Sequence, residues 1–379
     1  MKAKSIKGKS VEEINTELAG CMSDNFQPTL AIVFLSALDE LEAVCAILDN
    51  EGIRIFGAST GGEFIDGVVD EESIAIMLLD MNPSFFTISL LTANNNSTED
   101  IADIISAQGI KTFSNPGYII SIAGRLIDGT LLINGMDKKL GKNVSIFGGL
   151  AGNLIDGSGT SVFDNNNRTP NGLLSLIIDN DKIEMTGFAT SGWQPIATFH
   201  TITKSEGHMV STIDEEPAMD MIAKYLGKSF EADTTEEIIY SKEASPIQLY
   251  RDNSPSVLRE ITYFNGKTRE VHFSGPVTQG TKFRFSLPPD WDIVDKIKSD
   301  CLMVKEQKQP EADAVIIFSC SARLLSLGPM INSEIEEIKN TWECPTVGYF
   351  CFGEIGRYLE GETEFHNNTC SIVLLKEKI

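Results

Sequence analysis

The sequence is short of positive charge. Its 31 lysines and arginines stand against 54 aspartates and glutamates, which gives a formal net charge of −23 at pH 7. A field of that sign repels both nucleic-acid backbones and anionic lipid surfaces. The composition therefore argues against nucleic acid as a partner.

The sequence also lacks an apolar run long enough to span a bilayer. The most apolar stretches, LAIVFLSAL and GLLSLII, are too short or are soon interrupted by acidic residues, whereas a spanning helix needs about 20 apolar residues. The basic opening MKAKSIKGKS is not followed by the apolar core of a signal peptide. We expect a cytoplasmic protein without a membrane partner.

A pairing motif for cysteine and the zinc-protease motif H-E-x-x-H are missing too. Seven cysteines without a C-x-x-C pair fit neither a disulfide framework nor a zinc site, so we expect most to be reduced and buried and expect no metal site. The motif H-E-x-x-H is absent. Cys320, His366 and Glu354 are of the types that a nucleophile, a base and an orienting group need, but nothing in their spacing supports catalysis. We therefore expect a protein that is not an enzyme.

The stretch VGYFCFGEIG, from Val347 to Gly356, lacks the lysine of a phosphate-binding loop. Gly348 and Gly353 have the spacing of such a loop, but Glu354 occupies the position of the lysine. A carboxylate there would repel a polyphosphate. We interpret the stretch as a turn at the end of a strand.

What the sequence does contain is one pattern written three times. LAIVFLSA, YIISIAG and AVIIFSCSA are apolar strands, and each is followed by residues at helical spacing and then by a second strand. The second strands end in the glycine-rich turns ASTGGEF, GGLAGN and FCFGEIG. Glu63, Asn153 and Glu354 each follow a glycine in these turns. We predict that the three turns end equivalent strands.

This pattern is typical of parallel β-α-β units, whose strands are buried on both faces. In open α/β sheets, ligands bind beyond the carboxyl ends of the strands. Arg125 and Arg323 follow two of the first strands, and arginine is suited to hold a carboxylate. We predict that Arg323 and Glu354 face one pocket together with EFHNNT, from Glu364 to Thr369.

These segments resemble the FIST family, a sensory module with paired N- and C-terminal FIST domains, over nearly the whole chain. FGASTGGEF followed by SIAIMLLD is similar to the N-terminal signature of the family, and IFGGLAGN to its second glycine motif. The stretch SGWQPIATFHTITKSEGHMVSTIDEEPAMDMIAKYLG resembles the join between the halves, and GYFCFGEIG with EFHNNT resembles the closing signature. Asn153 stands where the family pattern leads us to expect an acid.

The resemblance implies a sensory protein of signal transduction that binds a small molecule such as an amino acid or its derivative. The matched segments leave no room for an output domain, so the protein would report to a separate partner such as a histidine kinase or a cyclase. One alternative, implied by some stand-alone members, is a haem-binding nitric-oxide sensor that acts on a histidine kinase. An uncharacterised enzyme is the other alternative.

Eight residues are candidates for contact with the ligand, and several have a structural alternative. Glu63 and Glu354 could instead cap a helix or order a turn. Cys320 could be a small buried hydrophobe, and His366 a hydrogen-bonded structural histidine or a haem ligand. The remaining candidates are Asn367 in EFHNNT, Arg125 and Arg323, which could pair with the glutamates, and Asn153.

We expect an α/β fold with mixed sheets. It would contain two sheets built from repeated β-α-β units, two FIST-type domains, and strand-rich insertions around TFHTITKSEGHMVSTI and between LREITYF and FRFSLPP. Within the second insertion, Asn265-Gly266 predicts a two-residue hairpin loop. We place the domain boundary near Pro217, with an N-terminal domain at 1–217 and a C-terminal domain at 218–379.

Overall fold

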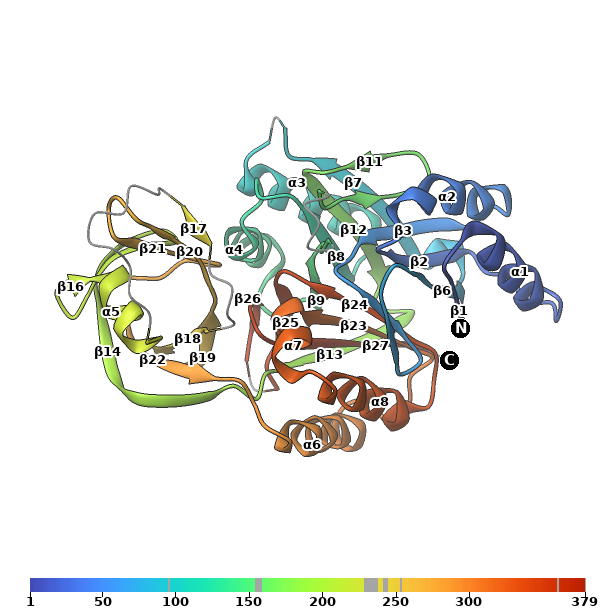
Figure 1. Cartoon of the computed structure of the whole chain (residues 1–379). Helices are drawn as coiled ribbons and strands as arrows, with labels where there is room; N and C mark the ends of the chain where they lie inside the picture. Colours follow the sequence, from blue (N-terminus) through green and yellow to red (C-terminus); the bar gives the residue numbers. More distant parts are fainter. Residues whose placement is uncertain are drawn as a thin grey trace.

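A computed structural model of the chain describes residues 1–94, 96–153, 159–227, 238–240, 245–252, 254–359 and 361–378. The chain forms a core of three α/β units, on the right in Figure 1, and a strand-rich body on the left. Both termini lie at the end of the core that is farthest from the body (Figure 1).

The three units share one order of elements: an outer strand, a helix, a β-α-β unit, a short hairpin and a long returning strand. Unit one contains β1 (Lys2–Gly8), α1 (Val11–Met22), β2 (Leu30–Leu35), α2 (Leu41–Asn50), β3 (Arg54–Ser59), β4 (Glu63–Ile65), β5 (Val68–Asp70) and β6 (Ile74–Asp80). Unit two contains β7 (Phe86–Thr92), α3 (Thr98–Thr112), β8 (Pro116–Ala123), α4 (Gly129–Leu140), β9 (Ile146–Leu150), β10 (Val162–Phe163), β11 (Arg168–Thr169) and β12 (Gly172–Asp179). Unit three contains β13 (Ile183–Thr190), α6 (Asp292–Gln307), β23 (Ala314–Cys320), α7 (Ser321–Leu327), α8 (Met330–Trp342), β24 (Thr346–Cys351), β25 (Glu354–Arg357), β26 (Thr363–His366) and β27 (Cys370–Glu377).

The predicted threefold repeat is confirmed. β2 pairs in parallel with β3, β8 with β9, and β23 with β24. Glu63, Asn153 and Glu354 follow the ends of β3, β9 and β24, as predicted. The described chain has three six-stranded sheets of this kind, one more than predicted, because each β-α-β unit carries antiparallel strands of its own.

The short hairpin of each unit joins the sheet of another unit. β4 of unit one pairs with β24 of unit three, β25 of unit three pairs with β9 of unit two, and β10 of unit two pairs with β3 of unit one. These exchanges close a ring. Every one of the three sheets therefore needs strands from two units.

The inner faces of the three sheets share one apolar core, and the helices cover the outer faces. The rings of Phe34 and Tyr349 have centroids 4.5 Å apart, and those of Phe318 and Tyr349 lie 5.5 Å apart. In unit two, Ser121 takes the position of Phe34 and Phe318, and its hydroxyl lies 2.9 Å from that of Tyr349. The small side chain of Ser121 leaves room for the buried hydroxyl of Tyr349 and forms a hydrogen bond with it. Buried polar groups need such a partner.

Glycines on two of the second strands make room for the exchanged hairpins. A Cβ atom on Gly57 would lie 2.1 Å from the ring of Phe163 in β10, and one on Gly348 would lie 2.2 Å from the ring of Phe64 in β4. We expect Gly57→Ala or Gly348→Ala to lower the free energy of unfolding by about 1–3 kcal/mol, the usual cost of overpacking a core. Urea unfolding measures the change.

A helical glycine provides the control for these two substitutions. A Cβ atom on Gly20, in α1, meets nothing within 4 Å. Gly20→Ala should therefore raise stability by up to about 1 kcal/mol, because alanine favours the helix. Equal effects at the core positions and at Gly20 would contradict the packing argument.

In its described residues, the strand-rich body is a nine-stranded antiparallel sheet with one helix, inserted into unit three between β13 and α6. Its elements are β14 (Gln194–Glu206), β15 (Met209–Ile213), β16 (Glu216–Pro217), α5 (Ala218–Tyr225), β17 (Ile239–Tyr240), β18 (Ile247–Arg251), β19 (Ser254–Arg259), β20 (Ile261–Asn265), β21 (Glu270–Phe273) and β22 (Lys282–Leu287). The predicted boundary near Pro217 falls inside this sheet, where β16 pairs with β15. The sheet thus draws strands from both predicted domains.

The hairpin predicted at Asn265-Gly266 forms, but its loop is longer than two residues. Asn265 is paired with Glu270, so four residues connect β20 to β21. The side chain of Asn265 accepts hydrogen bonds from the backbone N–H groups of Lys267 and Thr268, which stabilises the wider turn. The two-residue loop is therefore a wrong prediction.

Candidate ligand-binding site

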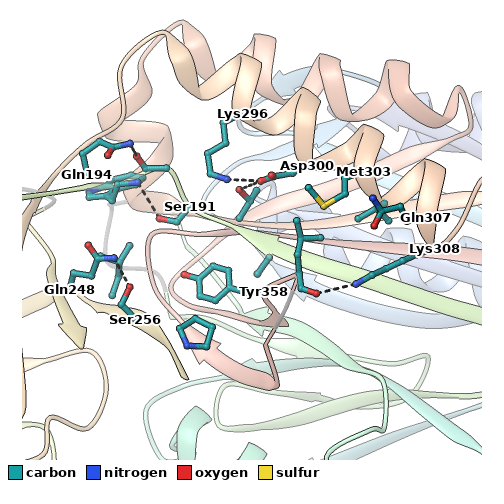
Figure 2. Close-up of a pocket in the computed structure, with 18 residues that line it drawn as sticks. Ser191, Gln194, Gln248, Ser256, Lys296, Asp300, Met303, Gln307, Lys308 and Tyr358 are labelled. Atoms are coloured by element: carbon teal, nitrogen blue, oxygen red, sulfur yellow. Dashed lines mark hydrogen bonds and ion pairs between the residues drawn. The ribbon is translucent and has the colours of Figure 1, made fainter. Parts of the chain in front are cut away.

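A cavity of about 540 Å³ lies between the body and unit three (Figure 2). Four parts of the chain line it: the end of β13 with the loop after it, strands β18 and β19, helix α6, and the loop between β25 and β26. Small-molecule sites usually measure about 300–1,000 Å³. The lining residues are Ala189, Thr190, Ser191, Gly192, Trp193, Gln194, Gln248, Pro255, Ser256, Leu258, Lys296, Asp300, Met303, Val304, Gln307, Lys308, Tyr358 and Leu359.

Three charged side chains, all from α6 or its end, line the cavity (Figure 2). Lys296 Nζ donates to Asp300 Oδ2 at 2.8 Å, and the hydroxyl of Thr190 donates to the same oxygen at 2.7 Å. Lys308, just past the end of the helix, donates to the backbone oxygen of Leu359 at 3.1 Å. The wall therefore carries two positive charges and one negative charge.

Two buried polar atoms of the lining have no hydrogen-bond partner within the described part of the chain. They are Nε1 of Trp193 and Oε1 of Gln248. The amide nitrogen of Gln248 donates to Ser256 Oγ at 2.5 Å, which fixes the side chain and leaves its oxygen available. An unpaired buried polar group costs about 1–3 kcal/mol. The described chain therefore leaves one donor and one acceptor of the lining residues unsatisfied.

Arg323 supports the cavity wall from behind. It is fully buried, and its guanidinium is paired with Glu334 of α8. It also donates to the backbone oxygens of Ser191, in the lining, and Asn368. The guanidinium lies 5.5 Å from the ring centroid of Trp193, within the range of a cation–π contact. Arg323 therefore fixes the loop that carries Trp193, and direct contact between Arg323 and a ligand stays a prediction.

Glu354 is enclosed in the protein interior. Its carboxylate accepts from the backbone N–H of Thr369 at 3.0 Å, from the Thr369 hydroxyl at 2.8 Å and from the Cys351 thiol at 3.3 Å. Burial raises the pKa of Glu354 to about 7 against the effect of these donors. Burial also raises the pKa of the adjoining Cys320 thiol well above its usual value.

The arrangement of Arg323 and Glu354 differs from the shared pocket that the sequence predicted. Neither side chain lines the cavity, and both are fully buried. The guanidinium is satisfied by Glu334, and the carboxylate by Thr369, just before β27, and the Cys351 thiol. Arg323 and Glu354 are nevertheless linked through two neighbouring residues. Arg323 donates to the backbone oxygen of Asn368, and the hydroxyl of Thr369 donates to Glu354.

Glu63 is enclosed by an equivalent set of hydrogen-bond donors, here called the cage, in unit one. Its carboxylate accepts from the hydroxyls of Ser36, Thr60 and Ser73 and from the backbone N–H of Ser73. Burial again raises the pKa, to about 7 for Glu63. Both acids thus order the turn that follows a second strand.

Unit two has lost this cage together with its acid. Ala123 and Ala151 stand at the register positions that Ser36 and Thr60 hold in unit one, so the hydroxyl donors are gone as well. Asn153 lies half-buried just after β9. The substitution of an amide for the acid is therefore part of a concerted change in this turn.

The other predicted residues lie outside the lining of the cavity. Arg125 is exposed, two residues past the end of β8. His366 is 1% exposed, its Nε2 lies 3.1 Å from the backbone oxygen of Gly356, and burial lowers its pKa to about 3. The side-chain oxygen of Asn367 accepts from the hydroxyl of Ser274 in the body at 2.6 Å.

The predicted segment 364–369 fastens the body to unit three. Arg251 of β18 donates to Glu364 at 2.8 Å, and Asn368 donates to Glu260, next to β19, at 2.8 Å. These contacts join the same two parts of the molecule that enclose the cavity. The segment therefore helps to set the width of the cavity.

Comparison with protein families identifies the chain. Residues 29–216 match the model of the FIST N domain, and residues 218–357 match that of the FIST C domain. The chain belongs to the FIST family. FIST domains are sensory domains of signal transduction and are suggested to bind small ligands. The search of curated proteins found no match.

The cavity of this FIST protein lies between the two matched halves. Residues 189–194 belong to the FIST N match, and the lining residues of β18, β19 and α6 belong to the FIST C match. Sequence patterns did not single out this set. Lys296 and Asp300 have the spacing of an ordinary helical ion pair. Trp193 stands out in the sequence only as part of the join between the halves. That tryptophan was the one available signal.

Other sequence expectations for this FIST protein concern its cysteines, metals and membranes. All seven cysteines are free and five are buried, which confirms that prediction. Within the described ranges, no group of three or more histidine, cysteine, aspartate or glutamate side chains is placed to hold a metal ion. None of the described helices has both the length and the apolar character needed to cross a membrane.

Proposed function

We propose that this FIST protein is a sensor that binds an amino acid or a derivative in the cavity between the body and unit three. The observation that supports this most is the set of polar groups in one cavity: a free donor on Trp193, a free acceptor on Gln248, and charges of both signs on α6. An amino acid carries a carboxylate and an ammonium group, which such a set can bind in one orientation.

We also propose that the protein reports to a separate signalling partner such as a histidine kinase or a cyclase. A molecule that contacts Gln248 of the body and Lys296 of unit three would link the two parts. Apart from contacts such as those of segment 364–369, they are joined by two chain connections, at 191–193 and 288–291. Occupancy of the cavity would change how firmly the body is held, and a partner could read that change.

The haem alternative gains no support from the lining of this cavity. Among the described lining residues there is no histidine or cysteine, and Met303 and Tyr358 are the remaining types that serve as axial ligands. Burial raises the pKa of the Tyr358 hydroxyl, which opposes the phenolate form. The residues of the cavity therefore do not fit haem, and haem binding elsewhere stays a prediction.

The enzyme alternative is likewise unsupported by the residues that suggested it. Cys320 is only 6% exposed, and the raised pKa of its thiol opposes the thiolate that a nucleophile needs. The lowered pKa of buried His366 opposes its action as a base.

A panel of the twenty common amino acids, tested by thermal unfolding of the whole chain, checks the sensor proposal. At least one should bind, and at about 100 times its Kd it should stabilise the protein by about 2.7 kcal/mol. Gln248→Leu removes the free acceptor and should weaken binding of that compound about tenfold, the equivalent of about 1.4 kcal/mol.

The matched control is Gln108→Leu on α3, because Gln108 is also half-buried but lies outside the cavity. It should bind the compound as the parent does. Equal affinity in the parent and in Gln248→Leu, or a panel in which no compound stabilises the protein, would count against the proposal.

A further inference from the structure

The charges that line the cavity do not cancel. Lys296 and Asp300 form an ion pair at 2.8 Å, and Thr190 donates to the same carboxylate oxygen. The side chain of Asp300 is only 12% exposed. Asp300, the one acid among the described lining residues, is thus already neutralised by its neighbours, and a cationic ligand would have to displace them.

Lys308 supplies the positive charge that is left over. Its ammonium group donates to the backbone oxygen of Leu359 at 3.1 Å, and that carbonyl carries no net charge. The described lining residues therefore carry a net charge of about +1, in a chain whose net charge is −23. A local charge opposite to that of the whole protein favours a ligand of the opposite sign at that point.

The unpartnered donor of the lining points to the same chemistry. Trp193 is 5% exposed, and its indole N–H has no acceptor in the described chain. The indole nitrogen can only donate, so it requires an acceptor such as a carboxylate oxygen. The free oxygen of Gln248 can only accept, and an ammonium group would satisfy it.

We propose that the ligand is an anion of the acidic amino-acid class, with two carboxylates and one ammonium group. One carboxylate is held by Lys308 and the other accepts from Trp193, while Gln248 accepts from the ammonium. This assignment rests on the proposed sensor function and specifies the charge of what is sensed.

The test compares L-glutamate with L-glutamine and L-lysine, by isothermal titration calorimetry on the whole chain at constant ionic strength. L-glutamate should bind at least tenfold more tightly than L-glutamine, which has nearly the same shape without the second charge. Lys308→Gln should weaken L-glutamate binding about tenfold and change L-glutamine binding little.

Lys305→Gln is the matched control. Lys305 lies in the last turn of α6, three residues before Lys308, and also donates to a backbone oxygen, that of Thr341, but it does not line the cavity. It should leave L-glutamate binding unchanged. An equal loss in Lys305→Gln and Lys308→Gln would mean that total charge matters and would overturn the assignment to Lys308.

The remaining outcomes separate this inference from the proposed function. If L-glutamine or L-lysine binds as tightly as L-glutamate, the anion proposal is overturned while the sensor proposal stands. If other members of the amino-acid panel bind and neither L-glutamate nor L-aspartate does, the anion proposal alone fails. If no compound of the panel binds, both fail.

Discussion

Arg323→Ala is expected to destabilise the protein by about 3–5 kcal/mol, because it leaves the carboxylate of Glu334 buried without its partner. Both side chains of this ion pair are 0% exposed. The substitution also removes the donors to the backbone oxygens of Ser191 and Asn368. Urea unfolding of the parent and variant measures the loss, which is much larger than the fold-neutral effect expected of a residue that only contacts a ligand.

Two further variants distinguish charge burial from loss of contact in general. Replacing both partners, as Arg323→Met with Glu334→Leu, should cost less than Arg323→Ala, because no charge then remains buried. Lys142→Ala breaks an ion pair with Glu362 whose side chains are 63% and 55% exposed, and it should change stability by less than about 1 kcal/mol. An Arg323→Ala protein within about 1 kcal/mol of the parent would refute the expectation.

The second large effect is a loss of stability as the pH rises from about 5 to about 8. Burial raises the pKa of Glu63 and of Glu354 from 4.5 to about 7 in the folded protein. The folded chain therefore keeps these protons to higher pH than the unfolded chain does. The resulting stabilisation is complete below pH 4.5 and is lost as the pH rises through 7, by on the order of 3 kcal/mol for each group.

Glutamine resembles the protonated acid, so the double variant Glu63→Gln, Glu354→Gln isolates this contribution. We expect its free energy of unfolding to depend on pH less steeply than that of the parent between pH 5 and 8. Urea unfolding at four pH values gives both slopes, and other titrating groups cancel in the comparison. Parallel slopes would show that the two carboxyls are not the source of the pH dependence.

The sequence predicts the repeat well because long apolar strands and glycine-rich turns are strong local signals. It does not predict the exchange of hairpins, because β4, β10 and β25 have three, two and four residues and show no periodicity of their own. The glycines at 57 and 348 mark the strands that receive the hairpins, but the partner ring lies in another unit.

The cavity was harder to predict than the fold. The sequence correctly places charged residues at strand ends, but it does not show whether their side chains face a ligand or the interior of the protein. Glu63 and Glu354 meet hydroxyl, thiol and backbone donors of their own unit instead, and Arg323 meets Glu334 on α8. The cavity itself combines four stretches that are distant in sequence and are brought together only by the tertiary structure.

The ring of exchanged hairpins has a consequence for synthesis of the chain. β4 is synthesised early, but its partner β24 is among the last strands to be made. Glu63 therefore cannot pair with Tyr349 until most of the chain has been synthesised. A three-residue strand cannot hold a ladder alone, and contacts so far apart in sequence form slowly. A nascent chain that stops before β24 also leaves β9 without β25. Two sheets then carry open edges at once, and such edges recruit strands of other chains.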